Sequence, residues 1–273
     1  MIRAVVTAVI LLLGTPLAAQ PLEPVTALAT SDGRTYQHCL DAVDKNPADA
    51  FEQAMAWRDT SGSLAAQHCI AAALLGLGQT MAAADRLERL GIAARAEPPV
   101  VRARVLAQAG QIWLQARNAE RAHALLSAAI EVAPELPDLY VDRSVTLAAA
   151  QNYWEAIDDL NKALELQPRY GVALAFRAAA YRYVDSIDLA NEDAEEAVRV
   201  APGLPEAWME RGILRRLRGD YKGARADWLR VLVLEPDGDA GDTARANIER
   251  LELRLDEKPA ALPPKPSRRW NPF

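Results

Sequence analysis

A fixed spacing of 34 residues runs through the second half of this chain. Proline recurs at that spacing four times, at Pro134, Pro168, Pro202 and Pro236. Between the prolines the sequence repeats a helical stretch, a short polar turn, a second helical stretch and a proline stop. A period of this length is typical of stacked helical units that contact mainly their neighbours. The spacing therefore predicts an all-α solenoid.

The period divides the sequence into four full units, 103–136, 137–170, 171–204 and 205–238. Small residues recur where the two helices of a unit must approach each other. One such register holds Gly110, Ser144, Ala178 and Gly212. Large apolar residues fill other registers, which indicates that volume is conserved between the two helices of each unit.

The last unit shows the repeat most clearly. Its recurring residues are Trp208, Gly212, Gly219, Tyr221, Ala224, Trp228 and Pro236. With these residues the chain resembles the tetratricopeptide repeat (TPR) family over about 64–238, and more weakly over 30–63. The resemblance implies antiparallel helix pairs stacked in a right-handed superhelix, with a concave groove lined by the first helix of each pair. Arg215 departs from the pattern, because the other units have an apolar residue there, and its packing requires a partner such as Trp228.

The regions that flank the four units differ from them in composition. We expect 35–102 to form degenerate N-terminal helical hairpins and 239–257 to form one amphipathic helix that caps the stack. The last segment, 258–273, is rich in proline and basic, and we expect it to be extended or disordered.

The first 19 residues have the pattern of a secretory signal peptide, followed by a linker over 20–34. Arg3 precedes an apolar run that is shorter than the ~20 residues needed to span a bilayer, which disfavours the alternative of an uncleaved anchor. The pattern predicts Sec-dependent export to the periplasm of a bacterium. No integral membrane segment is expected after cleavage.

The chain has two cysteines, Cys39 and Cys69, each within the tripeptide Gln-His-Cys. Both are expected on the first helices of consecutive hairpins, so in an oxidising compartment they favour a disulfide. A metal site that also uses His38 and His68 is the alternative. Neighbouring residues on a helix point about 100° apart and converge poorly on one ion. Two free buried thiols are the third interpretation.

Two charged registers follow the period. Arginines occupy one of them, at Arg143, Arg177 and Arg211, and aspartates the other, at Asp159, Asp193 and Asp227. The remaining unit has Ala109 and Leu125 there, so both charges are absent together. This pattern predicts an ion pair between the two helices of each hairpin. An arginine ladder that binds carboxylates is the alternative.

The geometry of the family that the chain resembles implies a set of groove-lining side chains. They are Val141, Val145, Phe176, Ala179, Tyr183, Met209 and Ile213. An apolar groove suits an amphipathic helix or an apolar peptide. The alternative is that these residues belong to the hydrophobic core. A basic rim beside the groove would contain Arg182, Arg215, Arg216 and Arg218, either as a solvated face or as an attraction for an acidic segment.

Composition and motifs restrict the class of function. The formal net charge is -6 and no basic stripe runs through the repeats, which disfavours a nucleic-acid partner. No Gly-rich phosphate loop, Cys-x-x-Cys pair or nucleophile elbow is present, so neither a cofactor nor a catalytic residue is predicted. The leading hypothesis is a non-catalytic scaffold for a protein or peptide of the cell envelope. A holdase-like chaperone and an unrecognised hydrolase are the alternatives.

The C-terminal tail generates the first prediction. Arg269, Trp270 and Phe273 combine aromatic and cationic groups, which are favoured in binding hot spots and have no folding use in a disordered end. We expect these residues to dock, into a partner or onto this chain. Truncation after Pro263 should then change partner recovery or sensitivity to protease. If both measurements match those of the full chain, the docking hypothesis is wrong.

Overall fold

The computed structural model describes Val25 and residues 33–256. The predicted signal peptide and the tail residues Arg269, Trp270 and Phe273 lie outside these residues. The described part consists of helices, and it contains no strand. In chain order they are α2 (Gly33–Lys45), α3 (Pro47–Ser61), α4 (Leu64–Gly76), α5 (Thr80–Ala93), α6 (Pro99–Gln115), α7 (Ala119–Val132), α8 (Pro137–Ala149), α9 (Tyr153–Leu166), α10 (Gly171–Tyr183), α11 (Ile187–Val200), α12 (Pro205–Leu217), α13 (Tyr221–Leu234) and α14 (Asp239–Asp256).

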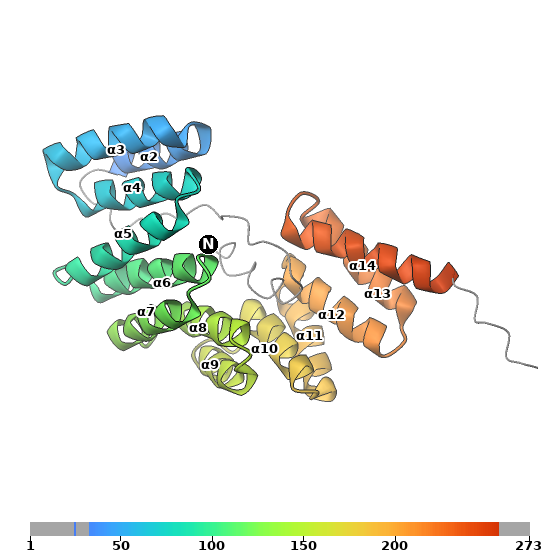
Figure 1. The fold of residues 1–273 in the computed structure, drawn as a ribbon. Coiled ribbons are helices and arrows are strands. Elements are labelled where there is room, and N and C mark those ends of the chain that lie inside the picture. Colours follow the sequence, from blue (N-terminus) through green and yellow to red (C-terminus); the bar gives the residue numbers. More distant parts are fainter. Residues whose placement is uncertain (1–24, 26–32, 257–273) are drawn as a thin grey trace, which may run out of the picture.

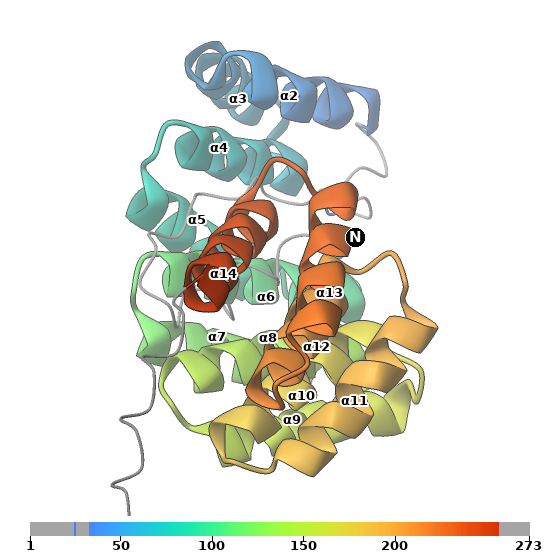
Figure 2. The same ribbon diagram turned by 90° about the vertical axis from the view of Figure 1, so that its right-hand side faces the viewer.

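Consecutive helices pack in pairs, from α2 with α3 to α12 with α13, and the pairs stack in chain order. Figure 1 shows that the stack bends into an arc with α2 and α3 at one end and α14 at the other. The view at 90° shows the same succession of pairs (Figure 2). The first helices of neighbouring pairs also contact one another, α6 with α8, α8 with α10 and α10 with α12, so they form the inner layer of the arc. The predicted all-α solenoid is confirmed.

The turn within each unit depends on one residue with positive φ. Arg117, Gln151, Asp185 and Gly219 occupy this position, with φ of 61°, 63°, 59° and 84°. Only the last is glycine, the residue that adopts this conformation most readily. The residue that follows is the N-cap of the second helix, and in the first unit the Asn118 side chain accepts a hydrogen bond from the backbone N–H of Arg121 at 3.0 Å. The short polar turns predicted from the sequence are therefore present between the two helices of each unit.

Pairs of small and large residues bring the two helices of a unit together. Gly212 lies directly against Trp228, which is fully buried, and a Cβ on Gly212 would lie 2.5 Å from the Trp228 indole nitrogen. In the first full unit Gly110 faces Leu126 in the same way, with a Cβ contact of 2.8 Å. Neither glycine can take a larger side chain without displacing its partner.

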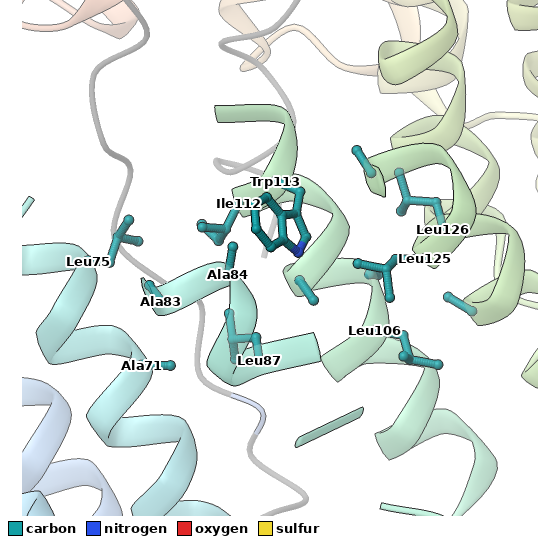
Figure 3. Packing of buried hydrophobic residues seen from close by; sticks show 14 of the residues in the cluster. Ala71, Leu75, Ala83, Ala84, Leu87, Leu106, Ile112, Trp113, Leu125 and Leu126 are labelled. Carbon is teal, nitrogen blue, oxygen red and sulfur yellow. The ribbon is translucent and has the colours of Figure 1, made fainter. Parts of the chain in front are cut away.

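The largest hydrophobic cluster joins the degenerate N-terminal pairs to the first full unit. Figure 3 shows Leu87 of α5, Leu106 and Trp113 of α6, and Leu126 of α7 among its members. Leu87 and Leu126 are completely buried, and such burial contributes about 1.5–3 kcal/mol for each side chain. The irregular first pairs are thus packed into the same core as the regular repeats.

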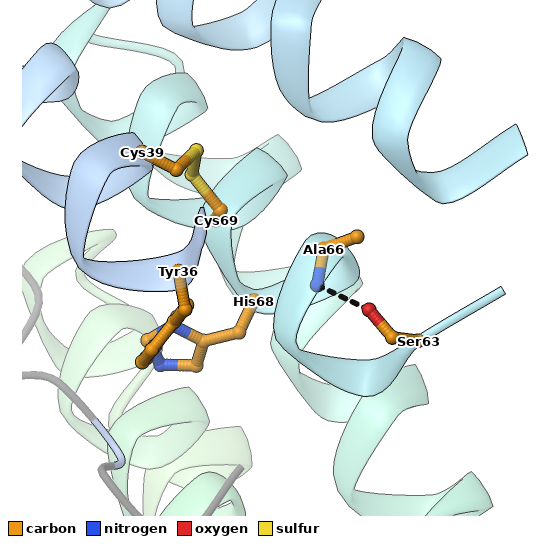
Figure 4. Close-up of a disulfide and its surroundings, with 6 residues drawn as sticks. All are labelled: Tyr36, Cys39, Ser63, Ala66, His68 and Cys69. Atoms are coloured by element: carbon orange, nitrogen blue, oxygen red, sulfur yellow. Dashed lines mark hydrogen bonds between the residues drawn. A yellow bond between two sulfur atoms is a disulfide. The ribbon is translucent and has the colours of Figure 1, made fainter. Parts of the chain in front are cut away.

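A disulfide joins Cys39 of α2 to Cys69 of α4, whose Cα atoms are 6.4 Å apart (Figure 4). The predicted disulfide is present, and it links the first helices of two consecutive pairs. His68 is fully buried, whereas His38 is exposed, so the two histidines do not converge with the cysteines on one ion. Within the described residues no group of three or more His, Cys, Asp or Glu side chains could hold a metal.

Three arginines make the same bidentate contact. Arg177 donates from Nε and Nη2 to the two carboxylate oxygens of Asp193, at 2.7 and 2.8 Å. Arg143 contacts Asp159 at 2.8 and 2.6 Å. Arg211 contacts Asp227 at 2.9 and 2.7 Å. Paired, partly buried charges of this geometry are stronger than exposed ion pairs. The structure therefore brings together each pair that the sequence pattern singled out.

Each of these arginines also reaches back to the preceding unit. The Nη1 atom of Arg143 donates to Ser127 at 3.2 Å. In the same way, Nη1 of Arg177 donates to Asn161 at 2.8 Å, and Nη1 of Arg211 donates to Glu195 at 2.8 Å. The three acceptors are themselves 34 residues apart, a register that the sequence analysis missed. One guanidinium thus ties the second helices of two successive pairs together.

Arg215 joins the same network. It donates to Asp227 at 3.0 Å and approaches Glu195 at 3.5 Å. The stack on Trp228 that the sequence suggested is not needed, because the carboxylates of α11 and α13 neutralise this arginine.

One further helix, α14, covers the C-terminal end of the described stack. At the C-terminal end α14 packs on α12 and α13, and its residues Ala244 and Leu251 share a core cluster with Trp228 and Val231.

Among the described residues no helix is both long and apolar enough to cross a membrane.

The bridging arginines generate the second prediction. Arg177→Ala and Asp193→Ala should each lower the free energy of unfolding by about 2–3 kcal/mol, because each leaves a partly buried charge without its partner. The double variant should lose less than the sum of the two, with a coupling energy of at least about 1 kcal/mol. Chemical denaturation of the four proteins measures this cycle. Strictly additive losses would contradict the pairing.

Candidate binding surface on the inner face

Polar side chains link the first helices along the inner layer. Gln111 of α6 donates to Asp142 of α8 at 2.9 Å. The Tyr170 hydroxyl, at the N-terminus of α10, donates to Asp138 of α8. These contacts connect three successive first helices, so Asp138 and Asp142 lie where α6, α8 and α10 meet.

Asp142 is unusual among the buried carboxylates. Its side chain is 6% exposed, and its Oδ1 atom has no hydrogen-bond partner. Burial, together with the charge of Asp138, raises the pKa of Asp142 to about 8, and the hydrogen bond from Gln111 opposes this rise only in part. At neutral pH the free protein therefore holds a neutral carboxyl group at this position.

An aromatic and apolar patch lies farther along the same helices. Tyr183 of α10 stacks on Tyr153 of α9, with ring centroids 4.7 Å apart. The two rings form part of an apolar recess whose lining includes Val145, Ala148 and Phe176. Val145 lines this recess three residues after Asp142 on α8, whereas Ala148, six residues after Asp142, points about 120° away from it.

Two arginines of the predicted basic rim are already paired. Arg182 of α10 makes a bidentate contact with the buried Glu210 of α12, at 2.5 and 3.1 Å, and lies over the Tyr183 ring. The Glu210 carboxylate raises the pKa of Arg182 against the opposing effect of burial. Since Arg215 also has carboxylate partners, two of the four arginines predicted for the basic rim are neutralised by ion pairs.

The seven residues predicted to line an open groove are mostly part of the core. Val141, Val145, Phe176 and Ala179 are 0–5% exposed. Val141, Val145 and Phe176 belong to one cluster that joins α8 to α10, because small residues on these first helices allow close approach. Tyr183 remains half-buried.

At the C-terminal end the predicted groove is filled by α14. Met209 is 6% exposed and packs in one cluster with Ala244 and Leu251, and the amide of Asn247 lies 3.6 Å from its sulfur. Ile213 packs against the same cluster. The burial of these side chains fits the core interpretation, and the expected open apolar trough is not what these residues form.

A network of buried, hydrogen-bonded side chains connects the N-terminal pairs to α6. His68 bonds through Nδ1 to the Tyr36 hydroxyl at 2.9 Å and through Nε2 to Gln108 at 2.8 Å. Complete burial lowers the pKa of His68 to about 4, so its ring is neutral at physiological pH. Tyr36 lies beside the disulfide (Figure 4). Because these side chains bond to one another, we regard this hydrogen-bond network as structural.

No protein-family model matches the chain. Protein O-mannosyl-transferase TMTC1 from Mus musculus is 30% identical over 156 residues, which are 56% of this chain and 16% of that protein. The heat-shock protein cognate co-chaperone sgt12 from Aspergillus fumigatus is 33% identical over 109 residues, 40% of this chain and 32% of that protein. The chain thus spans less than a third of the length of either relative.

Among solved structures, the thermophilic TPR protein TTC0263 from Thermus thermophilus superposes with a TM-score of 0.58. The match covers 70% of this chain and 100% of that chain, at 18% sequence identity. The chain has the TPR fold. The resemblance read from the repeat residues is confirmed by this match and by the stacked helix pairs.

In this TPR stack the sequence analysis missed the polar inner face. Asp142 and Gln111 were not singled out, because neither belongs to a residue type that repeats every 34 positions. One signal was available: Asp142 directly follows Val141 and lies three residues before Val145, so it places a carboxylate on an otherwise apolar helical face. His123, the remaining histidine, is exposed on α7.

The carboxyl group of Asp142 generates the third prediction. Its pKa is about 8 in the folded TPR stack and near 3.8 in an unfolded chain, so between these pH values the unfolded chain loses the proton first and rising pH favours unfolding. Asp142→Asn should therefore raise the melting temperature by about 5 °C at pH 8, since removing an unsatisfied buried charge is worth about 1–3 kcal/mol. Near pH 4 the two proteins should melt together. Asp158→Asn, at an exposed position of α9, is the control and should show no such trend. A gain that does not depend on pH would contradict the assignment.

Proposed function

We propose that this chain is a non-catalytic scaffold that holds a polypeptide segment of another protein on its inner face. The observation that carries the proposal is the arc itself. Its inner layer is built from the first helices of successive TPR pairs, and the arginines that fix the spacing of the pairs bond to the second helices instead (Figure 1). The inner-face side chains are therefore free to differ from unit to unit.

The distribution of ionisable groups supports a binding role. The buried carboxylates Asp159, Asp193, Asp227 and Glu210 each bond to an arginine, which is a structural use. The match to TMTC1 spans 16% of that protein, so we do not carry its transferase activity over. The relative sgt12 is named a co-chaperone, which fits a protein that acts on other proteins.

The proposed location is the periplasm, and the partner is a protein of the cell envelope. The disulfide between Cys39 and Cys69 supports this location, because such bonds persist mainly in oxidising compartments. The predicted signal peptide over 1–19 is the second argument.

A general holdase has less support than a scaffold with one partner. Such a chaperone needs a broad exposed apolar surface, and the side chains expected to provide it are buried. Polar groups placed singly on the inner face favour discrimination between partners.

Site-specific photo-crosslinking in the native compartment tests the proposal. A crosslinking side chain at Ala148, half-exposed on the inner layer, should give a discrete adduct with one partner. The same group at Arg199, exposed on the second helix α11, is the matched control and should give none. Equal adducts from both positions, or none from Ala148, would refute binding on the inner face. A smear of many adducts from Ala148 would favour the holdase.

A further inference from the structure

We propose that a pocket at the N-terminal end of the inner layer binds a branched aliphatic residue of the partner's segment, and that Val25 of this chain fills the pocket when no partner is bound. This inference rests on the proposed function and adds a site and a ligand chemistry to it. It starts from the burial of Val25, which belongs to the linker that precedes α2.

Val25 is seated between helices to which it does not belong. Its side chain is 2% exposed and packs in one cluster with residues of four helices, which are Tyr36 of α2, Ala65 of α4, Leu90 of α5, and Val101 and Val105 of α6. Three of these helices, α2, α4 and α6, are the first helices of successive pairs. The structure thus shows that a polypeptide segment can reach this pocket, because the linker supplies one.

The pocket recognises the main chain of its occupant as well as the side chain. The backbone N–H of Val25 donates to the Tyr36 hydroxyl at 3.1 Å. In the interior of an α-helix this N–H would be bonded to the carbonyl oxygen four residues earlier, and proline has no N–H. The lining is apolar, so a charged side chain would lose its hydration without compensation. The pocket therefore selects an aliphatic residue in a non-helical segment or at the very start of a helix.

Contacts that do not involve Val25 hold the pocket in shape. The Tyr36 hydroxyl bonds to His68 Nδ1 at 2.9 Å, and His68 Nε2 bonds to the side-chain carbonyl oxygen of Gln108 at 2.8 Å. That oxygen only accepts, so Nε2 carries the proton of the neutral ring and Nδ1 accepts from Tyr36. The hydroxyl keeps this bond when the linker leaves. The disulfide between α2 and α4 lies beside the network (Figure 4), so an empty pocket is already organised for another segment.

The contacts of Val25 are modest in strength. Burial of one valine and one hydrogen bond, the contacts that the structure describes for it, favour docking by a factor on the order of 100. The loss of backbone freedom in the linker opposes docking. A partner segment that fills the pocket in the same way and also contacts the rest of the inner face can therefore displace the linker. It must compete with a tethered ligand whose effective concentration is on the order of millimolar.

Peptide binding to the full chain tests whether the pocket accepts another segment. The probe is a labelled peptide with the sequence of residues 21–30, and fluorescence anisotropy is the measurement. Val25→Gly and Val25→Asp each remove the tethered ligand, so both variants should bind the peptide at least about tenfold more tightly than the unchanged chain. A peptide with aspartate in place of the valine should bind to none of the three. A peptide with an ester oxygen in place of the valine N–H should bind the variants about five- to tenfold more weakly, because the bond to Tyr36 is lost. Both variants should retain the circular dichroism of the unchanged chain.

Photo-crosslinking in the native compartment tests whether the partner uses the pocket. Leu40 of α2 packs beside the pocket and is half-buried. A crosslinking side chain at this position should give an adduct with the partner that Ala148 detects, and Val25→Gly should increase the yield at least about threefold. His38, exposed on the opposite face of α2, is the matched control and should give no adduct in either chain.

The outcomes separate the two proposals. If the Val25 variants bind the peptide no better than the unchanged chain, or if both variants lose their fold, the pocket is not an exchangeable site and the scaffold function stands. If the peptide binds as expected but Leu40 gives no adduct while Ala148 does, only the linker uses the pocket, and the scaffold function again stands without it. If neither Leu40 nor Ala148 crosslinks to a partner, the scaffold function is refuted, and the partner's use of the pocket with it.

Discussion

The guanidinium groups of Arg143, Arg177 and Arg211 hold successive helix pairs at a fixed spacing. Each bonds to an aspartate on the second helix of its own pair and to a polar side chain on the second helix of the pair before it. In a solenoid, stability is close to a sum of unit and neighbour terms, so a bridge repeated at three successive interfaces fixes the spacing of the pairs from α6–α7 to α12–α13. The inner face therefore receives its shape from contacts that lie outside it.

The difference between residues that hold the helix pairs together and residues of the inner face explains which of them could be predicted from the sequence. Residues that hold the repeat together must recur with it, as the small-residue register of Gly110 and Gly212 does, and a period exposes them without any structure. The second acceptor of each arginine was missed only because Ser127, Asn161 and Glu195 share a hydrogen-bonding capacity rather than a residue type. The fold, the disulfide and the partners of the arginines could thus be predicted with ordinary rules of packing and charge.

The inner face could not be predicted in the same way. The register of Asp142 contains Gln108, Asp142, Phe176 and Glu210, four residues with no common chemistry. All four are buried, and each has a different neighbour in the stack: Gln108 bonds to His68, Asp142 to Gln111 and Glu210 to Arg182, whereas Phe176 packs in the cluster that joins α8 to α10. The apolar residues predicted to line the groove are buried for a related reason. A valine or alanine is equally suitable in a groove and in a core, and these residues are part of the core because α8 and α10 pack together and α14 covers the last pair.

The position of Asp142 in the stack also has an energetic reason. Terminal units of a solenoid have one neighbour fewer and open most readily. Here the disulfide between Cys39 and Cys69 holds the first two pairs together, and α14 covers the last pair. The α8–α9 pair has neighbours on both sides, bound to it through Arg143 and Arg177. A buried carboxylate without a counter-ion destabilises the unit that contains it, so it is best tolerated where neighbour contacts are most numerous.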